Sequence, residues 1–221
     1  AATEREFKLL IWDYSMMTLM PRALALAQRE AKKVRFQLLP MIAPPHRSLE
    51  RGEADLLIIP KAHSSQEHPA DVLFEETFAC VAWQGSRVGC GELTFERYLN
   101  AEHVVMQPVG IDFPSYENWF IQRYGISRRI AITTYSFQAQ PYLVLGTEYV
   151  ATVHTRMAQH LQHTLPIVVR PVPLAMEPMP QVMQWHKYRT RDPGIVWLRD
   201  LMQRAASAMD AEMNEQRAQA A

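Results

Sequence analysis

Histidine and cysteine are the residue types here that could carry catalysis or bind a metal, but their spacing suits neither role. The eight histidines are scattered along the chain. His160 and His163 share a face of an expected helix, yet no acidic residue or thiol is placed to complete a zinc site. Cys80 lies in an apolar run, and Cys90 lies between two glycines. Two cysteines in so long a chain favour free thiols and a reducing compartment, with one disulfide as the alternative. We therefore expect no metal site.

The sequence motifs of common enzyme classes are also missing. The chain contains no glycine-rich phosphate loop, no G-x-G-x-x-G pattern and no G-x-S-x-G nucleophile turn. Catalytic groups can converge from distant positions, so missing motifs shift the balance without deciding it. They favour a protein that binds a small molecule, uses no cofactor and is not an enzyme.

Alternating strands and helices would have to position any functional residues. The first part of the chain predicts strands at 7–12, 34–39 and 55–59, with a helix at 17–31 and a short helix at 46–51 between them. Pro21 is tolerated only near the first turn of the longer helix, and Gly52 suits the end of the shorter one. This β-α-β-α-β order is typical of a parallel sheet with helices on its faces.

A second set of strands and helices follows a loop at residues 84–91. The apolar run 73–83 precedes this loop. The elements expected after it are a helix at 94–99, a strand at 103–106, a helix at 116–124, a strand at 129–135, a helix at 141–145, a strand at 149–153, a helix at 156–163, strands at 168–172 and 182–186, and a helix from 194 to about 213. We predict an α/β fold of two Rossmann-like lobes joined by two crossover strands, with 5–78 and 182–215 in lobe I and 82–178 in lobe II. Ligands of open α/β sheets bind beyond the carboxyl ends of the strands, which predicts a site in the cleft between the lobes.

Composition argues against binding of nucleic acid or membrane by this chain alone. The chain has 221 residues, with 23 Lys and Arg against 23 Asp and Glu, so its formal net charge is zero. Nucleic-acid binding needs a basic surface that displaces counterions. No apolar stretch approaches the length of a membrane span, and no signal peptide is evident.

Several blocks of the sequence, taken together, resemble one known family. They are Met-Pro-Arg-Ala-Leu at 20–24, Leu-Glu-Arg-Gly-Glu-Ala-Asp-Leu-Leu-Ile at 49–58, Phe-Glu-Glu-Thr-Phe-Ala-Cys-Val at 74–81, Leu-Gly-Thr-Glu-Tyr-Val-Ala-Thr-Val at 145–153, Met-Gln-Trp-His at 183–186 and Asp-Pro-Gly-Ile-Val-Trp-Leu-Arg at 192–199. Between about residues 7 and 202 the chain resembles the effector-binding domain of LysR-type transcriptional regulators. It is most similar to the flavonoid-sensing nodulation regulators and to the salicylate-type sensors of aromatic degradation.

The resemblance implies a periplasmic-binding-protein-like sensor from a longer cytoplasmic regulator. The N-terminal DNA-binding domain would be absent from this chain, so DNA would be contacted only through that missing part. Homodimers or tetramers are expected. The effector would be a planar aromatic molecule, phenolic or monocarboxylic. Its binding would shift the equilibrium between conformations, with a coupling free energy of about 1–3 kcal/mol.

The resemblance also implies a set of effector-contacting residues: Asp13, Ser15, Met16, Pro60, His103, Ser136, Phe137 and Trp185. Capping of a helix is the alternative for Asp13 and Ser15, and core packing is the alternative for Met16 and Phe137. His103 could instead be an exposed histidine at a strand edge. Trp185 could simply cross the hinge.

Two other functions stay open from the sequence. A periplasmic solute-binding protein would share the two-lobed plan but would carry a signal peptide. An enzyme with a cleft between lobes would turn over its substrate.

Overall fold

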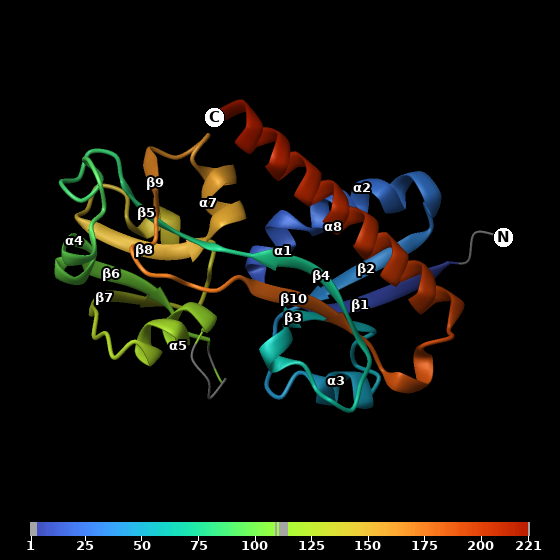
Figure 1. Ribbon diagram of the computed structural model, residues 1–221. Helices are drawn as coiled ribbons and strands as arrows, with labels where there is room; N and C mark the ends of the chain where they lie inside the picture. The colour runs from blue at the N-terminus through green and yellow to red at the C-terminus, as the bar shows by residue number, and fades with distance from the viewer. Residues whose placement is uncertain (1–3, 109, 111–114, 221) are drawn as a thin grey trace. The chain divides into compact units, whose positions relative to one another are not determined.

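The computed structural model describes residues 4–108, 110 and 115–220 and divides the chain into two compact units (Figure 1). Unit 1 consists of Ala1–Glu75 and Pro180–Ala221, and unit 2 consists of Glu76–Met179. The chain therefore leaves unit 1 once, after Glu75, and returns once, at Pro180. Each unit contains one five-stranded sheet, which confirms the predicted α/β class with two sheets.

Unit 1 is built on a mixed sheet in the order β2-β1-β3-β10-β4. Its strands are β1 (Arg5–Ile11), β2 (Val34–Leu39), β3 (Leu56–Pro60), β4 (Ala70–Glu76) and β10 (Met179–Gln184). Both β2 and β3 run parallel to β1, whereas β10 runs antiparallel to β3. Its helices are α1 (Asp13–Thr18), α2 (Met20–Glu30), α3 (His46–Glu50) and α8 (Pro193–Ala220), with the short 3-10 helices η1 (Lys61–His63) and η2 (Lys187–Arg189).

Alternate residues of β1 serve the two faces of this sheet, as the period of a strand requires. Leu10 belongs to a buried cluster with Leu49 of α3 and with Leu57. On the other face, Phe7 stacks on Trp197 of α8 with ring centroids 5.7 Å apart. The apolar runs of the sequence are therefore buried on both sides, which is typical of strands covered by helices on both faces.

The helix expected at 17–31 is two helices in the structure, so that prediction was wrong in its start and its continuity. Helix α1 begins at Asp13, and α2 begins at Met20 with Leu19 between the two. Pro21 lies in the first turn of α2, where its missing N–H costs no hydrogen bond. The proline thus marks the start of a second helix.

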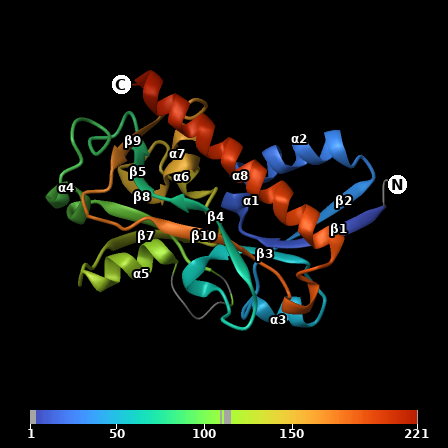
Figure 2. The same cartoon turned by 45° about the vertical axis from the view of Figure 1, so that its right-hand side comes forward.

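Helix α8 is longer than the predicted span, which ended near residue 213. It lies beside α2 in both views (Figures 1 and 2). Arg22 of α2 forms an ion pair with Glu212, and Glu30 forms one with Arg204. These two ion pairs join α2 to α8, and the one with Glu212 lies near the end of the predicted span. Within the described part of the chain, no helix is both long and apolar enough to cross a membrane.

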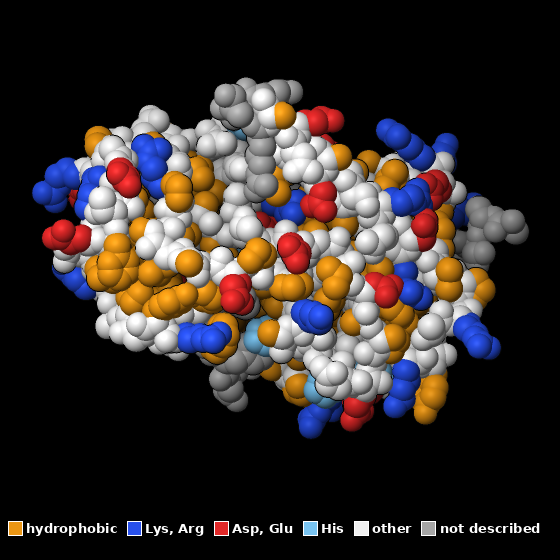
Figure 3. Space-filling model, in the orientation of Figure 1, with side chains coloured by type: hydrophobic (Ala, Val, Ile, Leu, Met, Phe, Trp, Pro, Cys, Tyr) orange, Lys and Arg blue, Asp and Glu red, His pale blue; other side chains and the backbone are white. Residues whose placement is uncertain are grey.

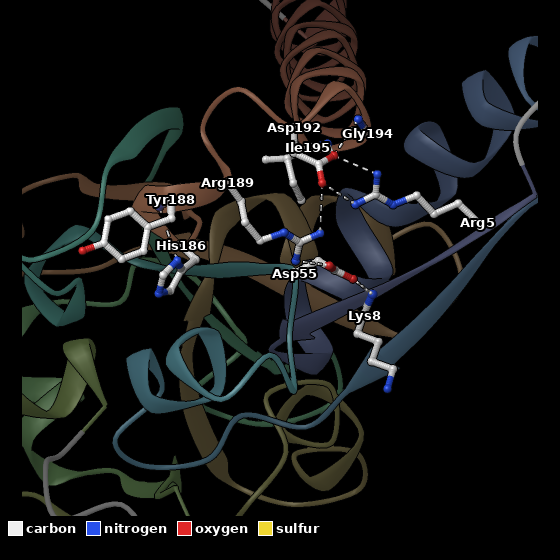
Figure 4. Close-up of polar contacts among 9 residues, drawn as sticks. All are labelled: Arg5, Lys8, Asp55, His186, Tyr188, Arg189, Asp192, Gly194 and Ile195. Atoms are coloured by element: carbon white, nitrogen blue, oxygen red, sulfur yellow. Dashed lines mark hydrogen bonds and ion pairs between the residues drawn. The ribbon is translucent and has the colours of Figure 1, made fainter.

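A charge network joins distant segments of unit 1 at the start of α8 (Figure 4). Asp55 accepts a hydrogen bond of 2.8 Å from the backbone N–H of Lys8 and pairs with Arg189. Asp192 pairs with Arg5 and caps α8 by accepting from the N–H of Gly194 at 2.8 Å. Asp55 closes the Gly-Glu-Ala-Asp block, so this block has a structural role at the amino end of β3.

Unit 2 contains a second mixed sheet in the order β7-β6-β8-β5-β9. Its strands are β5 (Phe78–Trp83), β6 (Glu102–Met106), β7 (Arg129–Thr134), β8 (Tyr149–His154) and β9 (Ile167–Pro171). Both β7 and β8 run parallel to β6, and β5 runs antiparallel to β8 and β9. Its helices are α4 (Phe95–Asn100), α5 (Tyr116–Arg123), α6 (Gln140–Leu143) and α7 (Thr155–Leu161).

The apolar run 73–83 divides between the two sheets. Its first half belongs to β4 and its second half to β5, with Thr77 between them. Glu76 and Thr77 are the polar residues at the division. Both cysteines are free, Cys80 buried and Cys90 exposed, as the sequence predicted.

Candidate functional site

In unit 1, Asp13 and Pro60 lie at the same edge of the sheet. Ile11 of β1 pairs with Ile58 of β3 in parallel register. Asp13 and Pro60 each follow their partner by two residues, so both lie at the carboxyl ends of these strands. Asp13 opens α1, and its Oδ1 accepts from the N–H of Tyr14 at 2.9 Å. Trp12 occupies the N-cap position of α1, so Asp13 accepts from an N–H of the first turn without being the cap.

Ser15 is the unusual member of this edge. Its side chain is 0 % exposed, and its Oγ has no hydrogen-bond partner within the part of the chain that the structure describes. A buried hydroxyl without a partner costs about 1–3 kcal/mol. Ser15 does not cap α1 through its side chain. Met16 lies next to it and is half-buried.

Trp185 lies at the opposite edge of the same sheet. It follows Gln184, which pairs with Leu57 near the amino end of β3 because β10 is antiparallel. Its ring is 2 % exposed, and the Arg199 guanidinium lies 3.7 Å from the ring centroid. Its Nε1 donates to Thr190 Oγ1 at 3.1 Å. The structure does not bring Trp185 together with Asp13, Ser15 and Pro60.

In unit 2, Ser136 and Phe137 lie at the carboxyl edge of the sheet. They follow Thr134, the last residue of β7, which pairs with Met106 at the end of β6. Ser136 Oγ accepts from the N–H of Ala139 at 3.2 Å and so shapes the turn before α6. The Phe137 ring meets His154 edge to face, with centroids 4.7 Å apart. Both residues are half-buried.

Sequence reasoning missed His154 at this edge. His154 is the last residue of β8, and Phe78 lies 5.3 Å from it on the antiparallel neighbour. Burial lowers the pKa of His154 to about 3, so its imidazole is neutral at physiological pH. The sequence signal for His154 was a polar residue directly after a predicted strand, which is the same signal that identified Ser136 as a candidate.

A buried ion pair beside His154 was also missed. Arg156 Nε lies 3.2 Å from Glu76 Oε2, and both side chains are almost fully buried. Glu76 Oε1 accepts from the N–H of Thr77 at 3.0 Å, and Thr77 Oγ1 donates to Thr155 Oγ1 at 2.8 Å. These contacts fix the start of α7 to the start of β5. A glutamate inside an otherwise apolar run was the available signal.

His103 lies away from this edge. It is the second residue of β6, three residues before Met106, or about 10 Å along a strand. Its ring is fully buried, packs edge-on against Tyr98, and places Nε2 2.8 Å from the Tyr98 carbonyl oxygen. Burial lowers the pKa of His103 to about 4, and the Arg128 charge acts in the same direction. His103 is thus neither exposed nor at the strand edge, the alternative considered from the sequence.

Each carboxyl edge by itself carries groups that can bind a small molecule. The edge in unit 1 has the Ser15 hydroxyl and the Asp13 carboxylate, and the edge in unit 2 has the Ser136 hydroxyl, the neutral His154 imidazole and the Phe137 ring. Among the described residues, no group of three or more His, Cys, Asp or Glu side chains could hold a metal ion. Burial raises the pKa of the Cys80 thiol to about 12, which keeps it protonated and unreactive.

Comparison with known proteins identifies the family. Residues 2–207 match the family described as the LysR substrate binding domain. The chain belongs to this family. It is the effector-binding domain of a LysR-type transcriptional regulator, and the alternative of a periplasmic solute-binding protein is not favoured.

Relatives of this LysR domain include proteins named for nodulation. Nodulation protein D 3 of Mesorhizobium japonicum is 32% identical over 95% of this chain and 69% of its own length. Nodulation protein D 1 of Rhizobium meliloti is 32% identical over 96% of this chain and 69% of its own length.

Solved structures show the same fold. A transcriptional regulator from Vibrio parahaemolyticus superposes with a TM-score of 0.85 at 22% identity, covering 96% of this LysR domain and 98% of that chain. The regulatory domain of MexT, a transcriptional activator in Pseudomonas aeruginosa, gives 0.79 at 18% identity, covering 93% of this chain and 100% of that chain. The effector binding domain of QuiR in complex with shikimate gives 0.75 at 10% identity, covering 93% and 99%.

Proposed function

We propose that this domain binds a planar aromatic effector, phenolic or monocarboxylic, and that binding regulates transcription by shifting the population of protein conformations. The buried, unpartnered hydroxyl of Ser15 at the carboxyl end of β1 is the observation that carries the proposal. A ligand polar atom that reached Ser15 Oγ would relieve the cost of leaving it without a hydrogen bond. Ligands of α/β sheets bind at this end of the strands.

The proposed contacts are Asp13, Ser15, Met16 and Pro60 in unit 1, with Ser136, Phe137 and His154 in unit 2. Phe137 and His154 offer aromatic surface, and Ser15 and Ser136 offer hydroxyls. Asp13 disfavours a fully anionic ligand but can accept a hydrogen bond from a phenol. His103 and Trp185 are left out because neither lies at the carboxyl edge of its sheet: His103 is the second residue of β6, and Trp185 lies at the opposite edge of the unit 1 sheet.

The activity that we propose is binding without turnover, in the cytoplasm. DNA would be contacted through a domain outside this chain, in a homodimer or tetramer. Lysine and arginine side chains are interspersed with acidic ones on the face that Figure 3 shows, which accords with a domain that does not itself hold DNA.

A thermal-shift panel tests the effector class. The panel contains flavonoids, salicylates, aliphatic acids, sugars and shikimate. A ligand at about 100 times its Kd stabilises the folded protein by about 2.7 kcal/mol, so a true effector raises Tm by several degrees. We expect this among the flavonoids or salicylates. A shift only with sugars, aliphatic acids or shikimate would contradict the aromatic assignment.

Ser15→Ala tests whether the buried hydroxyl contacts the ligand, with Ser207→Ala at an exposed position of α8 as the control. Because the Ser15 hydroxyl has no partner, the unliganded variant should be as stable as the wild type or more stable. Its affinity for the best aromatic ligand should fall about 2–10-fold, the worth of one hydrogen bond. Unchanged affinity would remove Ser15 from the site.

A further inference from the structure

The segment formed by residues 61–69 in unit 1 is held by one buried amide. Gln184 of β10 is fully buried. Its Oε1 accepts from the N–H of Ser65 at 3.0 Å, and its Nε2 donates to the carbonyl oxygens of Ser65 at 2.8 Å and His68 at 3.1 Å. The N–H of Trp185 donates to the Pro69 carbonyl at 3.3 Å. These four hydrogen bonds dock the segment on the end of β10.

The same segment buries an imidazole that makes no hydrogen bond. The His68 side chain is only 1% exposed. Neither of its ring nitrogens has a hydrogen-bond partner within the described chain. A buried polar ring of this kind costs free energy even when neutral, and it costs considerably more when it carries a charge. Docking of residues 61–69 therefore depends on His68 staying neutral.

Charged and titratable groups face His68 from each element around it. His186, which follows β10, places its ring centroid 5.0 Å away, and Lys187 contributes a positive charge nearby. Glu50 of α3 places Oε1 3.7 Å from His68 Nε2, and Glu67 lies on the segment itself. The positive groups oppose protonation and the carboxylates favour it. Burial is the largest effect, and the outcome is a lowered pKa for His68.

His186 contributes a second proton-dependent contact. Its Nδ1 accepts from the N–H of Tyr188 at 3.3 Å at the start of η2 (Figure 4). A nitrogen that accepts a hydrogen bond carries no proton, so this contact belongs to a neutral ring. Protonating Nδ1 would remove the acceptor and would place a positive charge about 5 Å from His68.

We propose that His68 and His186 make the docking of residues 61–69 sensitive to pH, so that the segment is held at neutral pH and is released on acidification. The sign follows from linkage. His68 in the released segment regains the ordinary histidine value of 6.5, whereas in the docked segment its pKa is lower. The released state therefore binds more protons below about pH 6.5, and docking weakens as pH falls.

Release would free the chain directly next to Pro60 of the proposed effector site. The segment begins at Lys61, directly after Pro60 at the carboxyl end of β3. Affinity for an aromatic effector should then fall with pH more in the wild type than in a His68→Gln variant. This consequence rests on the proposed function, whereas docking itself does not.

Amide hydrogen exchange at Ser65 tests the docking directly, in the absence of any ligand. After correction for the intrinsic exchange rate, protection of the Ser65 N–H should fall between pH 7.5 and 5.5, by at most tenfold per pH unit for each proton. His68→Gln should remove the part of the pH dependence that comes from protonation of His68. His186→Asn, whose amide can still accept from the Tyr188 N–H, should reduce the pH dependence. His160→Gln, at an exposed position on α7, should behave as the wild type.

An NMR titration of the His68 ring in the wild type covers the case in which His68→Gln leaves the segment undocked at every pH. A midpoint below 6.5 supports the proposal. A midpoint at or above 6.5, or a pH-dependent protection in His68→Gln equal to that of the wild type, overturns it. Equal pH dependence of effector affinity in both proteins would overturn only the link to the effector site.

Discussion

Arg5 and Asp192 form two hydrogen bonds of 2.7 and 3.1 Å although they are 187 residues apart in the sequence. Arg5 begins β1, and Asp192 immediately precedes α8. Asp192 also accepts from the N–H groups of Gly194 and Ile195 at 2.8 and 3.1 Å, so one carboxylate caps the last helix and fastens it to the first strand. Unit 1, assembled from both ends of the chain, depends on such contacts.

Replacing Asp192 with alanine should destabilise unit 1. Loss of a helix cap costs about 0.5–2 kcal/mol, and the partly exposed ion pair adds little. We expect a lower urea midpoint. Asp200→Ala removes an exposed carboxylate that pairs with Arg204 within α8, and it should have an effect within about 0.5 kcal/mol. Equal effects of the two substitutions would contradict the capping role.

The same carboxylate should contribute to acid unfolding. Hydrogen bonds from Arg5 lower the pKa of Asp192 from 3.8 to about 2. A lowered folded-state value means that its stabilisation is complete above pH 3.8 and is lost as pH falls toward 2. Between pH 3.8 and 2, the folded signal in circular dichroism should decrease less steeply with falling pH in Asp192→Asn than in the wild type. An unchanged profile would argue against the pairing.

His103 should destabilise unit 2 over a different pH range. Its folded-state pKa is about 4 against an ordinary 6.5, so the unfolded chain binds the proton first as pH falls. Stability should decrease from pH 6.5 to about 4, by up to about 1.36 kcal/mol per pH unit for one proton. Urea titrations should show a smaller decrease in His103→Gln, whose amide can still donate to the Tyr98 carbonyl. His160→Gln should match the wild type.

The buried pair Glu117–Arg128 in unit 2 should be far more sensitive than an exposed pair. Their side chains are 5% and 2% exposed, and Arg128 also donates to Asn118 Oδ1 at 3.0 Å. Arg128→Met leaves a buried carboxylate without its partner, which costs about 3–5 kcal/mol. Arg129→Met removes an exposed pair with Glu102 and should cost less than about 1 kcal/mol. The double variant Glu117→Gln with Arg128→Met should recover part of the loss.

Phe137 provides a test of the proposed effector contact in unit 2. Phe137→Leu keeps an apolar side chain but removes the ring that faces His154. Calorimetric titration with the best aromatic ligand from the panel should show weaker binding. Tyr142→Leu, at an exposed aromatic position of α6, should leave affinity unchanged. If both variants bind like the wild type, Phe137 is not part of the site.

Local sequence patterns determined most of the elements. The predicted strand 34–39 is β2 to the residue, and Gly52 ends α3 with a positive φ of 69°. Period, capping and proline rules act over a few residues, so a single sequence can express them. The same rules left the break at Leu19 unseen, because the pattern of apolar residues continues across it.

Long-range pairing decided which candidate residues share an edge. Asp13, Ser15 and Pro60 lie at the same edge because β1 and β3 are parallel, whereas Trp185 lies at the other edge because β10 is antiparallel. Strand order and direction depend on contacts between residues that are far apart in the sequence, and the local pattern of a strand is the same in either direction. The sequence by itself therefore determined the family, the α/β class and most strands, and only the tertiary structure could bring His154 to Phe137, remove His103 from the strand edge and place His68 beside His186.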